Sequence, residues 1–288
     1  MNRKPALCAG LVTLGLAGLA PAQTPLLCEK PSPYNTVIVT EENGMRTLRF
    51  ERGGARQSVV KLGDPDHLEL PYARTALVSL ALCNEPHRIL VVGLGGGSLP
   101  MVLRHHYPEA VIDAVDIDSE VVSVAKEYFG FREDSRMHAV VGDGRRFIEE
   151  TREPYDLVFL DAFGSNSVPR HLTTQEFLQA VRRSLTPTGL VIGNVWSRYS
   201  NPLYDAMVRT YQEVFDDLYI LDVAGAGNKI LLALPRKHPL NREELAQMAS
   251  QVTEAKKLRY DLGEIVKQGF SHASDKDGNT RVLKDGDK

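Results

Sequence analysis

The chain has 288 residues, of which 43% are hydrophobic and 25% charged, and its formal net charge at pH 7 is −3. This composition fits a globular protein with one large domain or two unequal ones. The slightly acidic balance and the scattered Lys and Arg residues argue against a binder of nucleic acid or of anionic membranes.

Residues 1–22 have the layout of a secretory signal peptide. The positive MNRK segment precedes an uncharged run of small and apolar residues, and Ala20-Pro21-Ala22 supplies an A-x-A cleavage pattern. The apolar run is short for a membrane span, which disfavours the alternative of an uncleaved anchor. The sequence therefore predicts an exported, periplasmic protein without stable membrane insertion after cleavage.

Export would leave two cysteines, Cys28 and Cys83, in the mature chain. They can pair in an oxidising compartment, but the sequence does not show whether they are close, so a disulfide stays open. No CxxC or HExxH spacing supports a metal site, and His105-His106 is interpreted as a solvated pair. The DKDGN segment has Lys284 where a calcium loop needs its Glu. The sequence thus predicts no metal.

Residues 23–68 are expected to form a small N-terminal antiparallel β-domain. After the Pro-rich stretch EKPSPY, three segments alternate in a strand-like way, YNTVIVTEE, MRTLRFER and ARQSVVKL. Asn43-Gly44 and Gly53-Gly54 separate them as turn signals. Residues 69–83 are typical of a helix.

From His87 onward, apolar strands and amphipathic helices alternate. Strands are expected within 87–95, 110–118, 137–144, 155–163, 189–196, 217–225 and 228–235, and helices within 98–107, 119–130, 145–151, 173–185, 202–215 and 240–268. This pattern predicts a Rossmann-like α/β domain over 69–235, with a mainly parallel sheet covered on both faces. The tight GAGN connection makes the last strand antiparallel. Residues 236–288 are predicted to form a C-terminal helix and a loose polar tail.

Polar and Gly-rich segments fall at the carboxyl ends of consecutive strands, where open α/β sheets bind ligands. A Gly-rich turn lacks the Lys-Ser/Thr of a phosphate-binding loop, and Asp116 follows it at the spacing of about 20 residues typical of ribose recognition. Asp118 is better placed to cap the following helix. Asp143 and Gly144 can take the exocyclic amine of adenine. The candidate adenosyl-binding residues are Gly93, Gly95, Gly96, Gly97, Asp116, Ile117, Asp143 and Gly144.

Each of these motifs can also be interpreted simply as a turn or a helix cap. Together, however, they favour an adenosyl ligand such as NAD(H) or S-adenosylmethionine. Asp161 ends the fourth strand, where the reactive end of that ligand would lie. A carboxylate there can hold or deprotonate an amine nucleophile. Asp161 is therefore the predicted catalytic residue.

The chain resembles the spermidine synthase (polyamine aminopropyltransferase) family, in its divergent bacterial spermidine-synthase-like branch. The resemblance spans about residues 34–235 and rests on the Gly-rich loop, the acid of VDID, GDGRRF, and the strand-end Asp followed by LTTQEFLQAVRRSLTPTGLVIGNV. It implies the S-adenosylmethionine-dependent methyltransferase fold and no permanently bound cofactor. The co-substrate would be S-adenosylmethionine or its decarboxylated form.

The resemblance also assigns roles to individual residues. Asp116 would hold the ribose, Asp143 and Gly144 the adenine, and Asp161 would act as acid/base and bind the acceptor. Gln57 would lie near the sulfonium, and Tyr72 matches the Tyr of a Tyr-His-Glu motif that binds the substrate.

Three departures affect cation binding. Gly95 stands where the synthases carry an Asp that grips the aminopropyl amine, Tyr72-Ala73-Arg74 replaces Tyr-His-Glu, and Gly164 replaces a second acid after Asp161. Arg74 would also add a positive charge. Because each lost charge-assisted hydrogen bond costs about 1.5–3 kcal/mol, putrescine is expected to be a poor substrate.

Three functions remain open. Aminopropyl transfer from decarboxylated S-adenosylmethionine to a small-molecule amine acceptor is favoured. Methyl transfer from S-adenosylmethionine is the alternative, since Gly95 removes an acid that would repel the donor carboxylate. The third is a non-catalytic exported protein that binds an adenosyl compound or a polyamine. A homodimer also stays open, and no nucleic-acid partner is expected.

Overall fold

A computed structural model describes residues 25–163 and 168–287. The predicted signal peptide, 1–22, and Gly164 lie outside these residues. Within the described part of the chain, no helix combines the length and apolarity that a membrane crossing needs.

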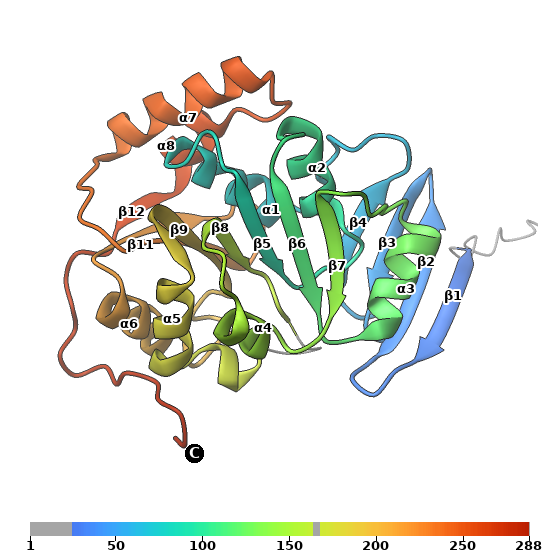
Figure 1. Cartoon of the computed structure of the whole chain (residues 1–288), viewed down its shortest axis with the longest axis horizontal. Helices are drawn as coiled ribbons and strands as arrows, with labels where there is room; N and C mark the ends of the chain where they lie inside the picture. The colour runs from blue at the N-terminus through green and yellow to red at the C-terminus, as the bar shows by residue number, and fades with distance from the viewer. Residues whose placement is uncertain (1–24, 164–167, 288) are drawn as a thin grey trace, which may run out of the picture.

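The N-terminal sheet has four antiparallel strands in the order β1-β2-β3-β4 (Figure 1). Their bounds are Leu26–Pro31, Thr36–Glu42, Met45–Arg49 and Arg56–Lys61. The last three strands lie where alternation predicted them, and Asn43-Gly44 forms the tight turn between β2 and β3 with positive φ at both residues. The strand β1 was not predicted, because LLCEKP has no clear alternation.

The larger sheet has eight strands, which run in the order β7-β6-β5-β8-β9-β11-β10-β12. Their bounds in chain order are β5 Arg88–Val92, β6 Val111–Asp116, β7 Met137–Val141, β8 Tyr155–Leu160, β9 Leu185–Trp196, β10 Asp217–Asp222, β11 Asn228–Leu234 and β12 Phe270–His272. Strands β5 to β9 are parallel, whereas β11 runs antiparallel to both β9 and β10. This arrangement confirms the predicted mainly parallel sheet with an antiparallel final strand.

Helices cover both faces of the larger sheet (Figure 1). One face carries α1 (Pro71–Ala76), a 3₁₀ turn (Leu77–Ala81), α2 (Ser98–His106), α7 (Arg242–Lys256) and α8 (Leu262–Gly269). The other carries α4 (Gly144–Glu150), α5 (Gln175–Arg183) and α6 (Tyr204–Val214). Alternate residues of β5 explain the two layers, since Ile89 and Val91 join one core and Leu90 and Val92 the other.

Helix α3 (Ser119–Tyr128) joins the two sheets. Val121 and Val124 pack into the core of the N-terminal sheet, whereas Val122 and Ala125 pack into the core of the larger sheet. Because α3 packs into both cores, it holds the N-terminal sheet beside the carboxyl end of β6.

The C-terminal tail is docked, which corrects the expectation of a loose segment. Leu283 is fully buried, its carbonyl accepts a hydrogen bond from the Gln175 amide at 2.7 Å, and its own amide donates to the Thr210 hydroxyl at 2.9 Å. The Asp285 carboxylate also pairs with Arg145. A single apolar residue in a polar run has no periodicity, so the sequence pattern did not reveal this contact.

Cys28 and Cys83 are both free thiols. Cys28 belongs to the core of the N-terminal sheet, whereas Cys83 packs against a core cluster of the larger sheet. The disulfide that the sequence left open is therefore not formed in this structure.

Candidate active site

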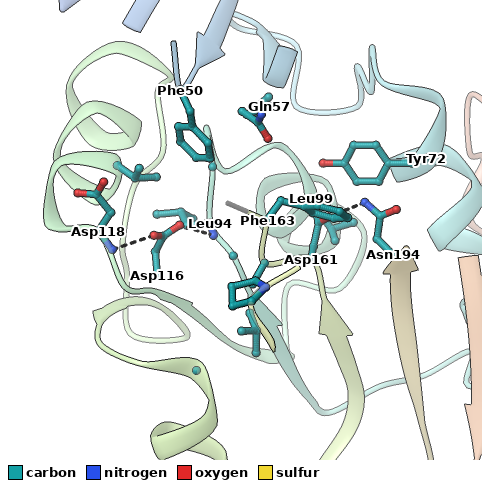
Figure 2. A pocket seen from close by; sticks show the side chains of 18 of the residues that line it. Phe50, Gln57, Tyr72, Leu94, Leu99, Asp116, Asp118, Asp161, Phe163 and Asn194 are labelled. Carbon is teal, nitrogen blue, oxygen red and sulfur yellow. Dashed lines mark hydrogen bonds between the residues drawn. The ribbon is translucent and has the colours of Figure 1, made fainter. Parts of the chain in front are cut away.

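A cavity of about 650 Å³ opens at the carboxyl ends of the parallel strands. This volume is within the usual range for small-molecule and cofactor sites. Asn35, Gln57 and Ser58 reach the cavity from the N-terminal sheet, so both sheets build it. Figure 2 shows Asp116 at one end and Asp161 at the other.

Two of the predicted glycines, Gly93 and Gly95, line the cavity. Gly93 has a φ of +101°, and any Cβ at this position would collide with the backbone carbonyl of Asp161. Only glycine allows this close approach, so Gly93 brings the turn after β5 against the end of β8. Gly95 faces the Ser58 side chain, so the cavity wall carries no acid at this position.

The other two predicted glycines, Gly96 and Gly97, do not line the cavity. A Cβ at either position would press on an aromatic ring, that of Phe129 or that of Phe131. Gly96 and Gly97 therefore let the turn pack closely against these rings, and they do not face the cavity.

Asp116 lies at the end of β6, as predicted, and its carboxylate is held by backbone amides. Oδ2 accepts a hydrogen bond from the Leu94 amide at 2.9 Å, and Oδ1 accepts one from the Asp118 amide at 3.0 Å. Burial raises the pKa of Asp116, against these hydrogen bonds, which lower it. Because each carboxylate oxygen has two lone pairs, acceptor sites remain for ribose hydroxyls. Ile117 lines the cavity beside it and is 40% exposed.

Asp118 caps helix α3, which confirms its expected role. Its side chain accepts from the Glu120 amide and from the hydroxyl of Ser32, which lies in the connection between β1 and β2. The cap therefore also fastens the N-terminal sheet to the rim of the cavity, where Tyr34 and Asn35 follow Ser32.

Asp143 and Gly144 lie where α4 begins beside the cavity. Asp143 accepts a hydrogen bond from the Arg146 amide at 2.9 Å, and its Oδ2 lies 2.9 Å from Nε2 of His171. Burial raises the pKa of Asp143, but hydrogen bonds from Arg146 and His171 outweigh it and hold the pKa below its usual range. A Cβ at Gly144 would collide with Val92, so glycine lets α4 approach β5.

His171 lines the cavity and was not predicted. It follows the end of β8 in a short 3₁₀ turn, Arg170–Leu172. Its contact with Asp143 joins two segments that are distant in the sequence, and no local motif marks such a contact.

Asp161 lies deep in the other end of the cavity, directly after β8. Its Oδ1 accepts a hydrogen bond from Nδ2 of Asn194 at 2.7 Å, and Tyr72 lies beside the same carboxyl group (Figure 2). Burial raises the pKa of Asp161 to about 7, and hydrogen bonding by Asn194 and Tyr72 opposes the rise only in part. Near neutral pH the group therefore exchanges readily between its acid and base forms.

Two asparagines hold Asp161 in place, and sequence reasoning missed both. Asn194 is on β9 and is 6% exposed, and its Oδ1 accepts from Nδ2 of Asn228 on β11 at 2.9 Å. Two successive hydrogen bonds therefore connect Asn228 to Asn194 and Asn194 to Asp161. A polar residue within the apolar strand VIGNVW was the one available signal.

Beyond Asp161 the wall of the cavity carries aromatic rings, and the lining also contains a cation, Arg56, which pairs with Glu69. Phe163 and Trp196 stack with their ring centroids 5.7 Å apart. In the described lining, the other carboxylates are Asp116, Asp118 and Asp143, which lie at or just after the ends of β6 and β7. Among the described residues, Asp161 is therefore the only acid in the half of the cavity that contains Phe163 and Trp196.

Arg74 does not line the cavity, which corrects the expectation that it adds positive charge there. Its guanidinium donates to the backbone carbonyls of Leu68 and Glu69 and lies 4.9 Å from the centre of the Tyr260 ring. Arg74 therefore holds the segment before α1 and leaves Tyr72 to face the site.

Comparisons with known proteins agree with this geometry. The family described as "Spermine/spermidine synthase domain" matches residues 71–219. A polyamine aminopropyltransferase of Vibrio vulnificus is 34% identical over 240 residues, which cover 81% of this chain and 79% of the relative.

Two solved structures extend the comparison. A probable spermidine synthase from Corynebacterium glutamicum superposes with a TM-score of 0.73 at 20% identity, over 92% of this chain and 98% of the other, which shows a shared fold. Human methyltransferase-like protein 13, solved in complex with SAH, is 34% identical with a TM-score of 0.57 over 66% of this chain and 90% of that one. With a family match over half of its length and a relative of this identity, the chain belongs to the spermine/spermidine synthase family of transferases, as its motifs predicted.

Proposed function

We propose that this protein transfers an aminopropyl group from decarboxylated S-adenosylmethionine to an amine acceptor. The observation that carries the proposal is the position of Asp161. A half-buried carboxyl group with a pKa of about 7 lies in the same cavity as an acid, Asp116, that retains free acceptor sites for a ribose. Membership of the transferase family supports the same reaction class.

The donor would lie along the strand ends with its adenosine toward α3 and α4. Asp116 accepts hydrogen bonds from the ribose hydroxyls, and Asp143 and Gly144 border the adenine. The sulfonium then lies between Gln57 and Asp161, which line the middle and the far end of the cavity (Figure 2).

The chemistry needs one proton acceptor and two well-placed reactants. The acceptor nitrogen attacks the aminopropyl carbon next to sulfur, the carbon–sulfur bond breaks, and a neutral thioether leaves with the bonding electrons. The proton from nitrogen passes to Asp161, which can take it because its pKa lies near neutrality. Holding both reactants in one cavity supplies much of the rate, since the sulfonium is already a good leaving group.

The acceptor half of the cavity favours an amine with little charge beyond the reacting nitrogen. Among the described residues, Asp161 is the one carboxylate there, and Phe163 and Trp196 provide an apolar surface. A second ammonium, as in putrescine, would lie in this half without a carboxylate partner. We therefore expect putrescine to react more slowly than a monoamine of similar length.

Methyl transfer is the second candidate. The human methyltransferase solved with SAH is as similar in sequence as the aminopropyltransferase relative, although over less of the chain. Gly95 also leaves no acid to repel the carboxylate of S-adenosylmethionine. The methyltransferase match covers 66% of this chain, however, whereas the aminopropyltransferase match covers 81%, so aminopropyl transfer stays the favoured reaction.

One experiment separates these candidates. The purified chain is incubated with either donor and a panel of amines, and the products are identified by mass spectrometry. Aminopropyl transfer adds C₃H₇N to the acceptor, and methyl transfer adds CH₂. Product from the decarboxylated donor alone supports the proposal, whereas CH₂ addition alone would replace it with methyl transfer. Tight binding of both donors without product would indicate a non-catalytic binding protein.

The proposal includes export, which rests on the N-terminal sequence. Cleavage after Ala22 would give a mature protein that begins at Gln23 and acts in the periplasm. Mass spectrometry of the native protein from a periplasmic fraction tests this, and an intact Met1 on a cytosolic chain would contradict it. Donor would then have to reach the protein from the cytoplasm, where such compounds are made.

A further inference from the structure

A second group of chemically capable side chains lies away from the cavity. Asp66 belongs to the segment between β4 and α1, and His105 and His106 form the end of α2. One possible ligand atom from each residue lies within 4.8 Å of the other two, and none of the three lines the cavity. This metal-ligand cluster, Asp66, His105 and His106, joins segments that are far apart in the sequence.

The Asp66 carboxylate lies between the two imidazoles. Its Oδ1 is 3.6 Å from Nε2 of His105 and 3.0 Å from Nε2 of His106. Successive side chains on an α-helix diverge by about 100°, so neighbouring histidines can share a partner only if it lies between them. The two rings are nearly perpendicular at 81°, with centroids 5.0 Å apart.

These contacts are not ordinary hydrogen bonds. Oδ1 of Asp66 is buried from solvent, and its nearest donor among the described residues, Nε2 of His106 at 3.0 Å, is not aligned as a hydrogen bond requires. A buried carboxylate oxygen without a partner is costly, and such cases need an explanation. An ion at the point shared by the three groups would satisfy this oxygen.

The distances match those of a metal centre. Zinc ligands lie about 2.0–2.2 Å from the ion in a tetrahedral site, which places neighbouring ligand atoms roughly 3.3 Å apart. The two measured distances, 3.0 Å and 3.6 Å, lie on either side of that value. The third distance, between the two imidazole nitrogens, is within 4.8 Å, so the three groups are close enough to converge on one ion.

We propose that Asp66, His105 and His106 bind a divalent transition-metal ion such as Zn²⁺, with water in the remaining position. Two imidazole nitrogens and one carboxylate suit such ions and not Mg²⁺ or Ca²⁺, which prefer oxygen ligands. The sequence alone predicted no metal and a solvated histidine pair, because nothing in it placed Asp66 beside α2. His106 is in fact mostly buried, with 12% of its side chain exposed.

The surrounding structure holds the backbone of the segment that carries Asp66. The Tyr260 hydroxyl donates to the Asp66 carbonyl at 3.2 Å and accepts from the Leu68 amide at 2.7 Å. A bound ion would then tie this supported segment, which leads from the N-terminal sheet, to α2 of the larger domain. The expected role is structural, as a link between the two parts that build the cavity.

The test uses the full chain without an affinity tag, treated with a chelator and dialysed. Calorimetric titration with ZnCl₂ should show saturable binding of one ion per chain, and MgCl₂ should show none. At a free zinc concentration about 100-fold above Kd, the melting temperature should rise by about 5 °C. Co²⁺ in place of Zn²⁺ should give the visible absorption of a four-coordinate site.

Matched variants locate the site. Asp66→Asn and His106→Ala should each weaken zinc binding about a hundredfold or more, since even indirect partners of metal ligands contribute 10–100-fold. His87→Ala removes an exposed histidine outside the cluster and should bind zinc as the parent protein does. Melting in the presence of chelator shows that each variant is folded.

Three results would overturn the proposal. These are the absence of saturable zinc binding to the folded parent chain, unchanged affinity in Asp66→Asn and His106→Ala, or a zinc-induced rise in melting temperature that persists in both variants. None of these outcomes depends on transferase activity, so the metal site and the proposed reaction can fail independently.

Discussion

At the scale of single residues, Asp161 combines a catalytic position with a cost to stability. Its pKa rises from an ordinary value of 3.8 to about 7 because it is partly buried. A carboxyl group whose pKa is higher in the folded than in the unfolded state stabilises the fold at low pH, and that contribution is lost as the pH rises from about 4 through 7. The loss amounts to about 4 kcal/mol, at roughly 1.4 kcal/mol per pKa unit.

The Asp161→Asn substitution should therefore separate function from stability. Turnover should fall about 100-fold or more, because Asn cannot accept a proton. The melting temperature should rise at about pH 8, where the wild-type carboxyl is charged, and the difference should shrink at about pH 5. Single-turnover rates and melting curves at both pH values check this.

Asp222→Asn is the matched control, because Asp222 is exposed and lies outside the cavity lining. It should change neither turnover nor the pH dependence of melting. A fully active Asp161→Asn enzyme would mean that Asp161 only ends the strand.

The same residue sets the expected pH profile. Because Asp161 must be deprotonated to accept the proton, kcat/KM should rise as the pH increases through about 7. Asn194→Ala removes a hydrogen bond that lowers this pKa, so the rising limb should move to higher pH. Asn228→Ala acts through Asn194 and should move it in the same direction by less. An unmoved limb in Asn194→Ala would show that the asparagine does not tune Asp161.

Residues at strand ends could be predicted because strand polarity brings those ends together. Asp116, Asp143 and Asp161 were found in this way. Asn194, Asn228 and His171 were missed because their roles come from partners on other strands and turns. Such pairings depend on the order of strands across the sheet, which the local pattern does not contain.

At the scale of elements, helices and strands with a clear period were predicted, and short or polar segments were not. Each of the strands β5 to β11 coincides with an apolar run in the sequence. Strands β1 and β12 have no such run and form through pairing with a neighbouring strand. The docked tail is the third case, since one buried leucine fixes a long polar segment. These elements are stabilised by tertiary contacts more than by intrinsic propensity.

The tail contact predicts a measurable contribution to stability. Leu283→Ala should lower the free energy of unfolding by about 2–5 kcal/mol, the range for a buried leucine. Leu62→Ala is the matched control, because Leu62 is 41% exposed and should cost less than about 0.5 kcal/mol. Denaturant unfolding of both variants checks this, and equal stability of the two would mean that the tail does not pack in solution.

At the scale of the whole molecule, the cavity belongs to both sheets. Gln57 and Ser58 come from β4, and Asp116 and Asp161 come from the ends of β6 and β8. A ligand that fills the cavity therefore contacts both parts of the fold at once. Binding should stabilise the molecule as a unit, since a ligand specific for the folded state adds free energy of unfolding that grows with its concentration.

The adenosyl thioether product of either donor should accordingly raise the melting temperature of the whole chain in one cooperative transition. Asp116→Ala removes the acceptor for the ribose hydroxyls, so its affinity for the thioether should fall tenfold or more, about 1.4 kcal/mol. Glu109→Ala is the control, because the Glu109 side chain is 87% exposed and distant from the cavity lining. Calorimetric titration of both variants with the thioether measures the difference. If Asp116→Ala bound the thioether as tightly as Glu109→Ala, the ribose would lie elsewhere, and the donor orientation that places its sulfonium beside Asp161 would lose its support.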